Sequence, residues 1–187
     1  MKNVLYYLIH NFRRINFMDV FKEYIVKREL SQGEKTSKIF TIAAAVALAA
    51  FFILLTFNTT LTLFGFVFAG LSIFIGYQLI TKLFVEYEYI LTNADLDIDK
   101  IINQAKRNRL CTIDLHKVSE YGVVNGDFAV GEDETLVKAG ANNPELTDYY
   151  LRFTHREFGK GVLVFTPSTE MTQLMKPFFP RNAVNKL

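Results

Sequence analysis

The feature that most constrains this 187-residue chain is a stretch of 43 residues, from residue 39 to residue 81, without a single Asp, Glu, Lys, Arg or His. As one helix the stretch would extend about 65 Å, roughly twice the 30 Å hydrocarbon core of a bilayer. Its polar residues concentrate near the middle, at residues 58–60. The stretch therefore predicts two antiparallel membrane-spanning helices, over 39–57 and 61–83, joined by a short turn.

Two other interpretations of this stretch fit less well. A pair of buried helices in a soluble core would show a polar stripe toward water, and neither segment has one. A cleaved signal peptide has a shorter apolar run, and the other apolar patch, over residues 4–9, is too short for one. The composition of the chain, 50% hydrophobic and only 21% charged, agrees with a membrane protein.

The charges on either side of the spans predict their orientation. Cations precede the first span and follow the second, whereas the turn at residues 58–60 has no charge. Cytoplasmic flanks carry an excess of Lys and Arg, so we expect both ends of the chain to face the cytoplasm. The flanking cations are Lys22, Lys27, Arg28, Lys35, Lys38, Lys82 and Lys100.

Small residues predict how the two helices pack, because they let helix backbones approach closely. Each helix has such residues at helical spacing, and we expect the two stripes to contact each other within the hairpin. Dimerisation between chains through these stripes is the alternative. The stripes consist of Ala43, Ala47 and Ala50 on the first helix and Gly65, Ala69, Ser72 and Gly76 on the second. Neither span contains an ionisable group, which argues against a pump or an ion-coupled transporter.

The segment before the spans, residues 1–38, is basic, with eight Lys and Arg against four acids. Met18, Phe21, Tyr24 and Ile25 recur at helical spacing. This pattern predicts an amphipathic helix that ends at residues 31–33 and lies on the inner membrane surface or packs on the cytoplasmic domain. Met18 is a second candidate start of translation, which would make residues 1–17 an extension.

Residues 84–187 are numerous enough for one small domain with its own core. Alternating apolar and polar residues predict strands over 85–92, 96–99 and 110–118, with Asp97 and Asp99 facing water and Ile113 and Leu115 in the core. A turn is expected at 93–95, and a basic turn or loop at 106–109. Strands are also expected at 121–124, 128–130, 135–138, 149–154 and 161–166.

A short helix is expected near the end of the domain. Ser168 is its expected N-cap, and Pro177 its stop. Met171, Leu174 and Met175 form its apolar face. These elements favour an antiparallel sandwich or barrel closed by one helix.

Several of these segments resemble bacterial pleckstrin-homology-like domains, many of which directly follow membrane spans. The segments are YEYILTN (87–93), LDIDKI (96–101), the basic turn 106–109, IDLHKV (113–118) and FTPSTEMTQLMKPFFPR (165–181). The resemblance covers roughly residues 84–181, and the nearest likeness is to small bacterial proteins that join a two-span hairpin to such a domain. It implies a seven-strand sandwich or barrel with one C-terminal helix, and no activity. Together with the predicted spans, we expect an inner-membrane location with both termini in the cytoplasm. The sequence departs from this pattern in its strand count between Tyr121 and Lys138.

The fold class predicted is therefore an α+β membrane protein, in which a transmembrane hairpin at 39–83 is followed by a mainly antiparallel pleckstrin-like sandwich or barrel with one C-terminal helix. No catalytic, cofactor or metal site is expected. Asp95, Asp97 and Asp99 cannot open a calcium loop, because Lys100 and Lys106 occupy the positions that need glycine and a bidentate acid. The formal net charge of +2 also argues against a nucleic-acid-binding surface.

Other reactive side chains have simple structural interpretations. Cys111 is expected to be a half-buried strand residue, and His116 and His155 are expected at the surface. The acids at residues 132–134 are expected to form an exposed loop. The chain is therefore expected not to be an enzyme.

The basic turn offers a specific functional hypothesis. Lys106, Arg107 and Arg109 are candidate contacts for anionic lipid headgroups, with an ordinary solvated turn as the alternative. The function expected is a membrane-anchored, non-catalytic cytoplasmic module for binding or self-association, whose protein partner or second copy the sequence does not identify. The alternative is an accessory subunit or regulator of a membrane transport or envelope complex that acts through the hairpin.

Overall fold

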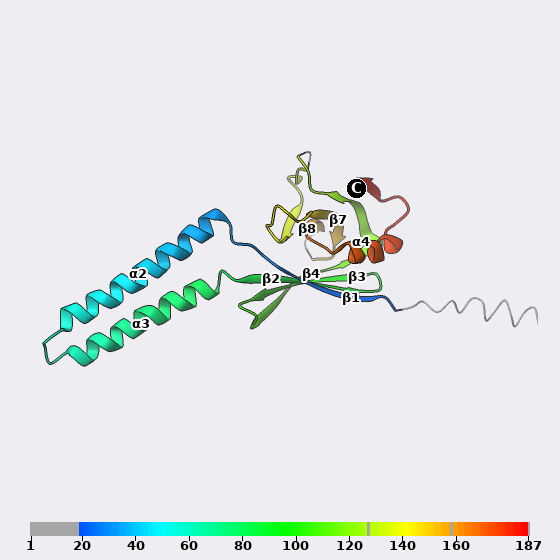
Figure 1. Cartoon of the computed structure of the whole chain (residues 1–187). Helices are drawn as coiled ribbons and strands as arrows, with labels where there is room; N and C mark the ends of the chain where they lie inside the picture. Colours follow the sequence, from blue (N-terminus) through cyan, green and yellow to red (C-terminus); the bar gives the residue numbers. More distant parts are fainter. Residues whose placement is uncertain (1–18, 127, 158, 187) are drawn as a thin grey trace, which may run out of the picture.

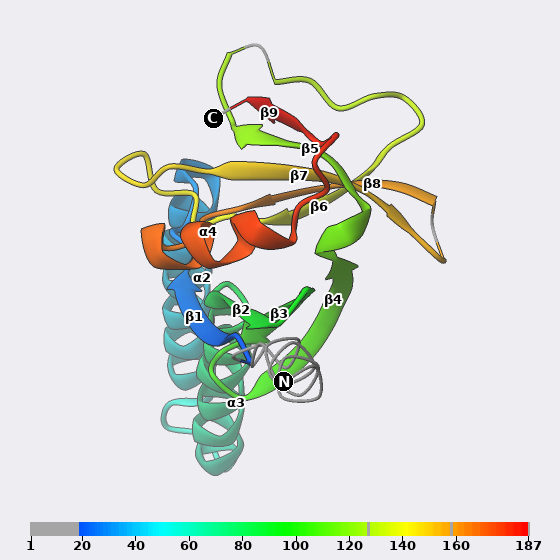
Figure 2. The same ribbon diagram turned by 90° about the vertical axis from the view of Figure 1, so that its right-hand side faces the viewer.

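The computed structural model describes residues 19–126, 128–157 and 159–186, and its core lies between two β-sheets. The first sheet is antiparallel, in the order β1-β2-β3-β4. The second is mixed, in the order β6-β8-β7-β5-β9, because β6 pairs parallel with β8 and β9 parallel with β5. Figure 2 shows the second sheet above the first, with α4 along the opening between them.

The described strands have the following bounds: β1 Phe21–Lys27, β2 Val85–Thr92, β3 Asp95–Ile102, β4 Lys106–Asp114, β5 Val118–Val123, β6 Thr135–Ala139, β7 Tyr149–His155, β8 Gly159–Phe165 and β9 Val184–Lys186. The helices are α2 Gln32–Thr56, α3 Thr62–Thr81 and α4 Thr169–Met175. Two 3-10 turns, Leu115–Lys117 and Lys176–Phe178, follow β4 and α4.

Helices α2 and α3 form a hairpin that projects away from the sheets (Figure 1). The hairpin lies between β1 and β2 in the chain, so it is an insertion within the first sheet and does not simply precede it. At 1.5 Å per residue, α2 extends about 37 Å and α3 about 30 Å. Both helices are long and apolar enough to cross a membrane.

The helix predicted from Met18, Phe21, Tyr24 and Ile25 is wrong over residues 21–27, which form strand β1. Met18 and the proposed extension 1–17 lie outside the described residues. β1 pairs with β2 in antiparallel register, with Tyr24 opposite Tyr89. The segment also alternates, with Val26 buried and Phe21 and Ile25 exposed. The segment fits both helical spacing and strand alternation, and its long-range pairing with β2 makes it a strand.

The first helix begins earlier than its apolar run. Ser31, placed in the expected break, is the N-cap of α2 and forms a capping box with Glu34. The Glu34 N–H donates to Ser31 Oγ at 3.3 Å, and the Ser31 N–H donates to Glu34 Oε2 at 2.8 Å. The charged first turns of α2 therefore lie outside the apolar run that the sequence marks.

Most of the strands predicted after the hairpin are confirmed, including those over 85–92, 135–138, 149–154 and 161–166. The helix at the end is also confirmed, with the Met171 N–H donating to Ser168 Oγ at 3.1 Å. The strand predicted over 128–130 is not formed by the residues described there, and β9 was not predicted. Two parallel strand pairs make the second sheet mixed. One contains β6, which lies in the region 121–138 where the sequence departs from the family pattern, and the other contains the C-terminal strand β9.

The packing of α2 on α3 corrects one of the two small-residue stripes. On α3, Gly65, Ala69 and Gly76 are buried. On α2, Ala43, Ala47 and Ala50 are exposed, and a different face contacts α3. That face includes Ala45, Ala49 and Thr56. Alanine fills most positions from 43 to 50, so its spacing does not define a single face.

Two glycines of α3 set the distance between the helices. A Cβ at Gly76 would lie 2.8 Å from the Cβ of Ala45, and a Cβ at Gly65 would lie 1.8 Å from Thr56 Oγ1. The Ser72 hydroxyl approaches the Ala45 carbonyl at 3.4 Å. The helices are therefore as close as hydrogen side chains at these positions allow.

We expect Gly76→Leu to destabilise the hairpin by about 1–3 kcal/mol, because the added side chain forces the helices apart. Gly70→Leu is the matched control, since no atom lies within 4 Å of a Cβ added there. The measurement is thermal unfolding of the full chain in detergent, followed by the helical circular dichroism signal. Equal midpoints for the two variants would contradict this packing.

Candidate membrane-facing neck

Two short connections join the hairpin to the first sheet, and we call them the neck: residues 28–31 and residues 82–84. The Arg28 N–H donates to the Val85 carbonyl at 3.0 Å, which ties the first connection to the start of β2, directly after the second connection. The Glu29 N–H donates to the Ala141 carbonyl at 2.7 Å, which ties the neck to the loop between β6 and β7. The neck is thus held by both sheets and is not a free linker.

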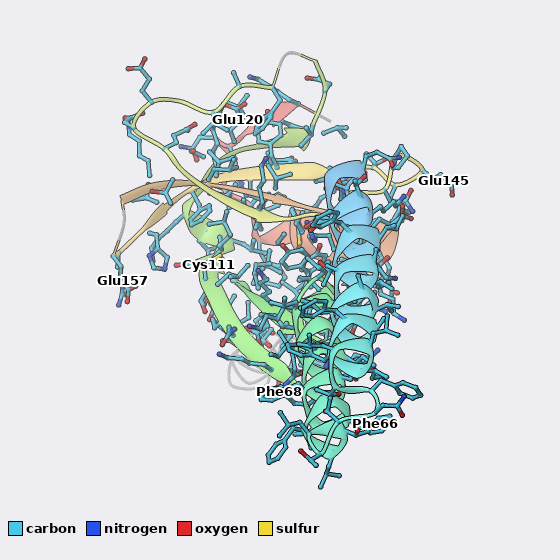
Figure 3. All side chains as sticks on the ribbon, turned by 90° about the vertical axis from the view of Figure 1, so that its left-hand side faces the viewer. Phe66, Phe68, Cys111, Glu120, Glu145 and Glu157 are labelled. Atoms are coloured by element: carbon cyan, nitrogen blue, oxygen red, sulfur yellow. The ribbon has the colours of Figure 1, made fainter. Side chains whose placement is uncertain are left out.

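Side chains reinforce the neck from two directions. Asn142 Nδ2 donates to the Glu29 carbonyl at 2.9 Å, and Asn143 Nδ2 donates to Glu29 Oε1 at 2.8 Å. Figure 3 shows Glu145 of the same loop near the start of α2. These contacts connect the base of the α2–α3 hairpin to the loop of the second sheet, so both sheets hold the hairpin in its orientation.

An ion pair between Arg28 and Glu34 crosses from the neck to the first turn of α2. The hydrogen bond from Arg28, followed by that from the Ser31 backbone, lowers the pKa of Glu34 below its ordinary value. The carboxylate therefore stays charged at the helix N-terminus, where the helix dipole favours a negative charge.

Cations and an aromatic ring surround the bases of both helices. Lys35 and Lys38 lie in the first turns of α2, and Lys82 follows the last residue of α3. The Lys38 Nζ lies 5.2 Å from the centroid of the partly exposed Phe84 ring. Lysines next to an aromatic ring at helix ends are typical of the bilayer–water boundary.

A pocket of about 220 Å³ opens beside the neck, where the β3–β4 turn meets the starts of β2 and of the hairpin. Gln104 in this turn donates from Nε2 to Glu86 Oε1 at 3.2 Å, and the Lys27 Nζ lies 3.8 Å from the same oxygen. Phe84 and Asn103 complete the lining. The wall of the pocket therefore combines one cation and one carboxylate with an aromatic ring.

The basic residues predicted to form a turn lie instead in strand β4, and the turn is residues 103–105. Lys106 begins the strand next to this turn. Arg107 Nη2 donates to Glu88 Oε1 at 3.0 Å. Arg109 donates from Nε to Asp99 Oδ1 at 2.6 Å. Both arginines pair with acids across the sheet, although their side chains remain 55% and 48% exposed, whereas Lys106 has no ion pair within the described residues.

Arg107 and Arg109 form an ion-pair network with Glu88, Asp97 and Asp99, and two of these acids are buried. The side chain of Glu88 is 1% exposed and that of Asp99 3% exposed. Asp99 was predicted to face water, and the structure corrects this because Arg109 spans it and Asp97. Burial, followed by a hydrogen bond that the protonated Glu88 carboxyl donates to Glu23, raises the pKa of Glu88 above its ordinary value.

The register of β3 with its two neighbours, β2 and β4, explains the ion pairs between Arg107, Arg109 and the acids. Asp99 lies opposite both Glu88 on β2 and Arg109 on β4. A register shift next to Asp99 brings Arg109 into line with it. A signal was present in the sequence, because acids on one strand and bases on the next pair across an antiparallel hairpin.

The remaining reactive groups show no arrangement for catalysis in the described ranges. Burial raises the pKa of the Cys111 thiol to about 12, so this thiol is not a nucleophile at neutral pH. In residues 19–126, 128–157 and 159–186, no group of three or more His, Cys, Asp or Glu side chains has the geometry of a metal site. His116 is exposed and His155 partly exposed.

Large apolar side chains cover the surface of the hairpin beyond the neck. They include Phe40, Leu54, Leu63 and Phe66, and their exposure contrasts with the buried core between the sheets. Figure 3 shows Phe66 and Phe68 on the part of the hairpin that is far from the sheets. An apolar patch of this extent on a monomer indicates a surface that water does not normally cover.

The comparisons with known proteins give one match. A family model described as "Bacterial PH-like domain (DUF6106)" matches residues 18–185, a range that contains β1, the hairpin and both sheets except Lys186, the last residue of β9. The comparisons with curated proteins and with solved structures give no match.

Proposed function

The chain belongs to the family of bacterial PH-like domains described as DUF6106, and from this membership we propose that it is a membrane-anchored, non-catalytic binding module. The hairpin inserts into the inner membrane of the cell, and the two sheets lie on the cytoplasmic side. PH-like folds host many functions, so the proposal depends on the site and not on the fold.

The observation that carries the proposal is the contrast between the hairpin and its neck. The hairpin exposes apolar side chains along its length, and the neck concentrates cations around its base. A bilayer accommodates both, since its hydrocarbon core takes the helices and its headgroups take the cations. The excess of Lys and Arg at the base supports a cytoplasmic position for both ends.

Anionic headgroups contact the module at the neck in this proposal. Lys35, Lys38, Lys82 and Lys106 lie at or next to the helix bases. Each contributes about 1 kcal/mol when it approaches an anionic surface. Arg107 and Arg109 already pair with acids of the first sheet, so a headgroup would compete with these acids for them.

A second candidate function assigns the work to the hairpin. Ala43, Ala47 and Ala50 form an exposed stripe of small residues on α2, away from α3. A helix of another membrane protein packs well on such a surface. In this alternative the chain is an accessory subunit or regulator of a membrane complex.

The chain contains no tryptophan, so one introduced tryptophan reports on a single position. We expect Phe84→Trp, in full chain reconstituted into vesicles, to be quenched by lipids brominated near the headgroup. Quenching should increase when the vesicles contain phosphatidylglycerol, and that increase should disappear when Lys35→Glu and Lys82→Glu are added.

Phe178→Trp is the matched control, because Phe178 lies in the 3-10 turn that follows α4. Figure 1 shows α4 on the side of the sheets away from the hairpin. It should show no quenching in either vesicle. A Phe84→Trp variant that brominated lipids do not quench would refute the membrane-facing neck, and quenching independent of phosphatidylglycerol would refute the role of anionic headgroups.

A further inference from the structure

Strand β9 covers one edge of the second sheet. It consists of three residues, all exposed, and pairs parallel with β5. Figure 2 shows it at the outer edge of the sheet, beyond β5. The segment 179–183 connects it to the 3-10 turn after α4. A strand this short and exposed adds little to the core, yet it pairs an edge that would otherwise present free N–H and C=O groups.

Strand β5 does not depend on β9 for its place. It pairs antiparallel with β7 over most of its length, from Val118 opposite Phe153 to Val123 opposite Tyr149. Leu151 of β7 and Val118 of β5 are buried in the core. The edge of β5 therefore remains formed when β9 leaves, and it can accept another extended segment.

The backbone of β5 is shaped for a closely approaching strand. Gly122 lies opposite Lys186, and a Cβ at Gly122 would lie 2.7 Å from the Lys186 carbonyl oxygen and 2.8 Å from its Cβ. The same atom would lie 3.0 Å from the ring of Tyr150. Glycine at this position therefore leaves space for a strand that any side chain would obstruct.

The Glu120 carboxylate on β5 favours a cation on any strand that pairs with this edge. Glu120 accepts from the Tyr150 hydroxyl at 2.6 Å, and its carboxylate pairs with Lys186 Nζ at 2.9 Å and Arg152 Nη1 at 3.1 Å. Partial burial alone would raise the pKa of Glu120, but these three donors outweigh it and hold the pKa at about 2. The carboxylate is thus charged at neutral pH, and loss of Lys186 removes one of its two cationic partners.

A pocket of about 360 Å³ lies beside this carboxylate, between the second sheet and the loop after β5. Phe128 and Tyr150 supply aromatic walls, with ring centroids 4.8 Å apart. An incoming cation on Glu120 would lie beside these rings, as Lys186 and Arg152 do at the edge of this pocket. Figure 3 shows Glu120 at the end of the molecule away from the hairpin, where a membrane would not cover it.

We propose that the edge of β5 is a docking site for an extended segment of a partner protein with a Lys or Arg opposite Gly122, and that β9 occupies this site until the partner displaces it. The partner would pair with the β5 backbone and place its cation on Glu120. This inference names the partner chemistry for the proposed binding function, and it requires no contact with lipid.

The test uses a fluorescein-labelled peptide with the sequence of residues 179–186 as the probe. The full chain in detergent is compared with a chain shortened after Ala183, which lacks β9. A tethered strand competes at an effective concentration near the millimolar range, so the peptide should bind the shortened chain at least about tenfold more tightly. Fluorescence anisotropy measures both affinities.

Two changes test the chemistry of the site. A probe with Lys186→Glu should bind the shortened chain at least about tenfold more weakly, because it brings a second carboxylate to Glu120. Gly122→Ala in the shortened chain should also weaken binding, because its Cβ occupies the space of the incoming backbone. Near-ultraviolet circular dichroism establishes that each shortened chain keeps its tertiary fold.

A second measurement avoids truncation. Lys186→Glu in the full chain should open β9 and accelerate amide hydrogen exchange in residues 184–186, whereas Lys160→Glu on β8 should leave this exchange unchanged. The inference is overturned if a folded shortened chain does not bind the probe, or if the Lys186→Glu probe binds it as tightly as the unchanged probe. It is also overturned if Lys186→Glu in the full chain leaves the exchange of residues 184–186 unaltered. A doubled mass of the full chain in light scattering, abolished by truncation after Ala183, would assign the edge to a second copy and overturn the assignment to a partner.

These outcomes are independent of the vesicle experiment. Failure of the peptide to bind would leave the quenching of a tryptophan at residue 84 unchanged and would refute only the docking site. Failure of quenching together with peptide binding would refute the membrane-facing neck and retain the docking site.

Discussion

We expect Arg109→Met to lower the free energy of unfolding by about 3 kcal/mol, because it leaves a buried carboxylate without its cation. Arg109 donates to Asp99, whose side chain is 3% exposed, and also pairs with Asp97. Methionine keeps an apolar stem of similar length, so the loss is mainly that of the charge. The measurement is the urea midpoint of the near-ultraviolet circular dichroism signal, with the full chain in detergent.

A second substitution separates the charge from the packing. In the Arg109→Met background, Asp99→Asn should restore part of the lost stability, since an amide is less costly to bury unpaired than a carboxylate.

Lys106→Met is the control for the loss of a cation from β4. Lys106 is exposed and has no ion pair within the described part of the chain, so its replacement should change stability by less than about 0.5 kcal/mol. Equal changes in the free energy of unfolding for Arg109→Met and Lys106→Met would show that the ion pairs of Arg109 contribute nothing to stability. Arg109 would then behave as a solvated side chain, as the predicted basic turn implied.

The same residues show why the sequence predicted the strands here but missed the network. Alternation identifies β2 and β3, and places Tyr89 and Leu96 in the core correctly. It assigns Asp99 to the solvent face, which is geometrically right, yet that face is covered by arginine side chains from the next strand. Period alone gives the direction of a side chain, and its burial depends on which residue lies opposite.

Strand β1 and strand β9 illustrate a second limit. Both pair with strands that are distant in the sequence, β1 with β2 across the hairpin and β9 with β5. Nothing local distinguishes β1 from a helix, since its apolar residues fit both periods, and β9 is too short to show any period. The hairpin was predictable because its signal is compositional and continuous, whereas the site at the β5 edge depends on tertiary contacts.

These pairings also change how the domain should be studied. A fragment of residues 84–187 lacks β1, which covers the open edge of β2 and buries Val26 in the core. The fragment would expose that edge and lose one strand of the first sheet. Experiments on the neck and on the β5 edge therefore need the full chain.

The second large effect is expected from arginines placed in the middle of both helices. Leu48 and Leu71 are each 48% exposed on the hairpin surface. Arginine at the centre of a membrane-spanning helix costs about 3 kcal/mol on insertion scales, so Leu48→Arg together with Leu71→Arg should cost about 6 kcal/mol. We expect the double variant to be largely lost from membranes washed with alkaline carbonate, while the wild-type chain remains in them.

Leu146→Arg is the matched control, because Leu146 is 43% exposed but lies in the loop between β6 and β7. This variant should remain in the washed membranes. The opposite result also has a clear physical meaning. If the hairpin were part of a water-soluble assembly, arginines at its exposed positions would be solvated at little cost, and carbonate would release the wild-type chain as readily as the double variant. That outcome would refute insertion and would leave the exposed apolar helices to be explained by contact with protein.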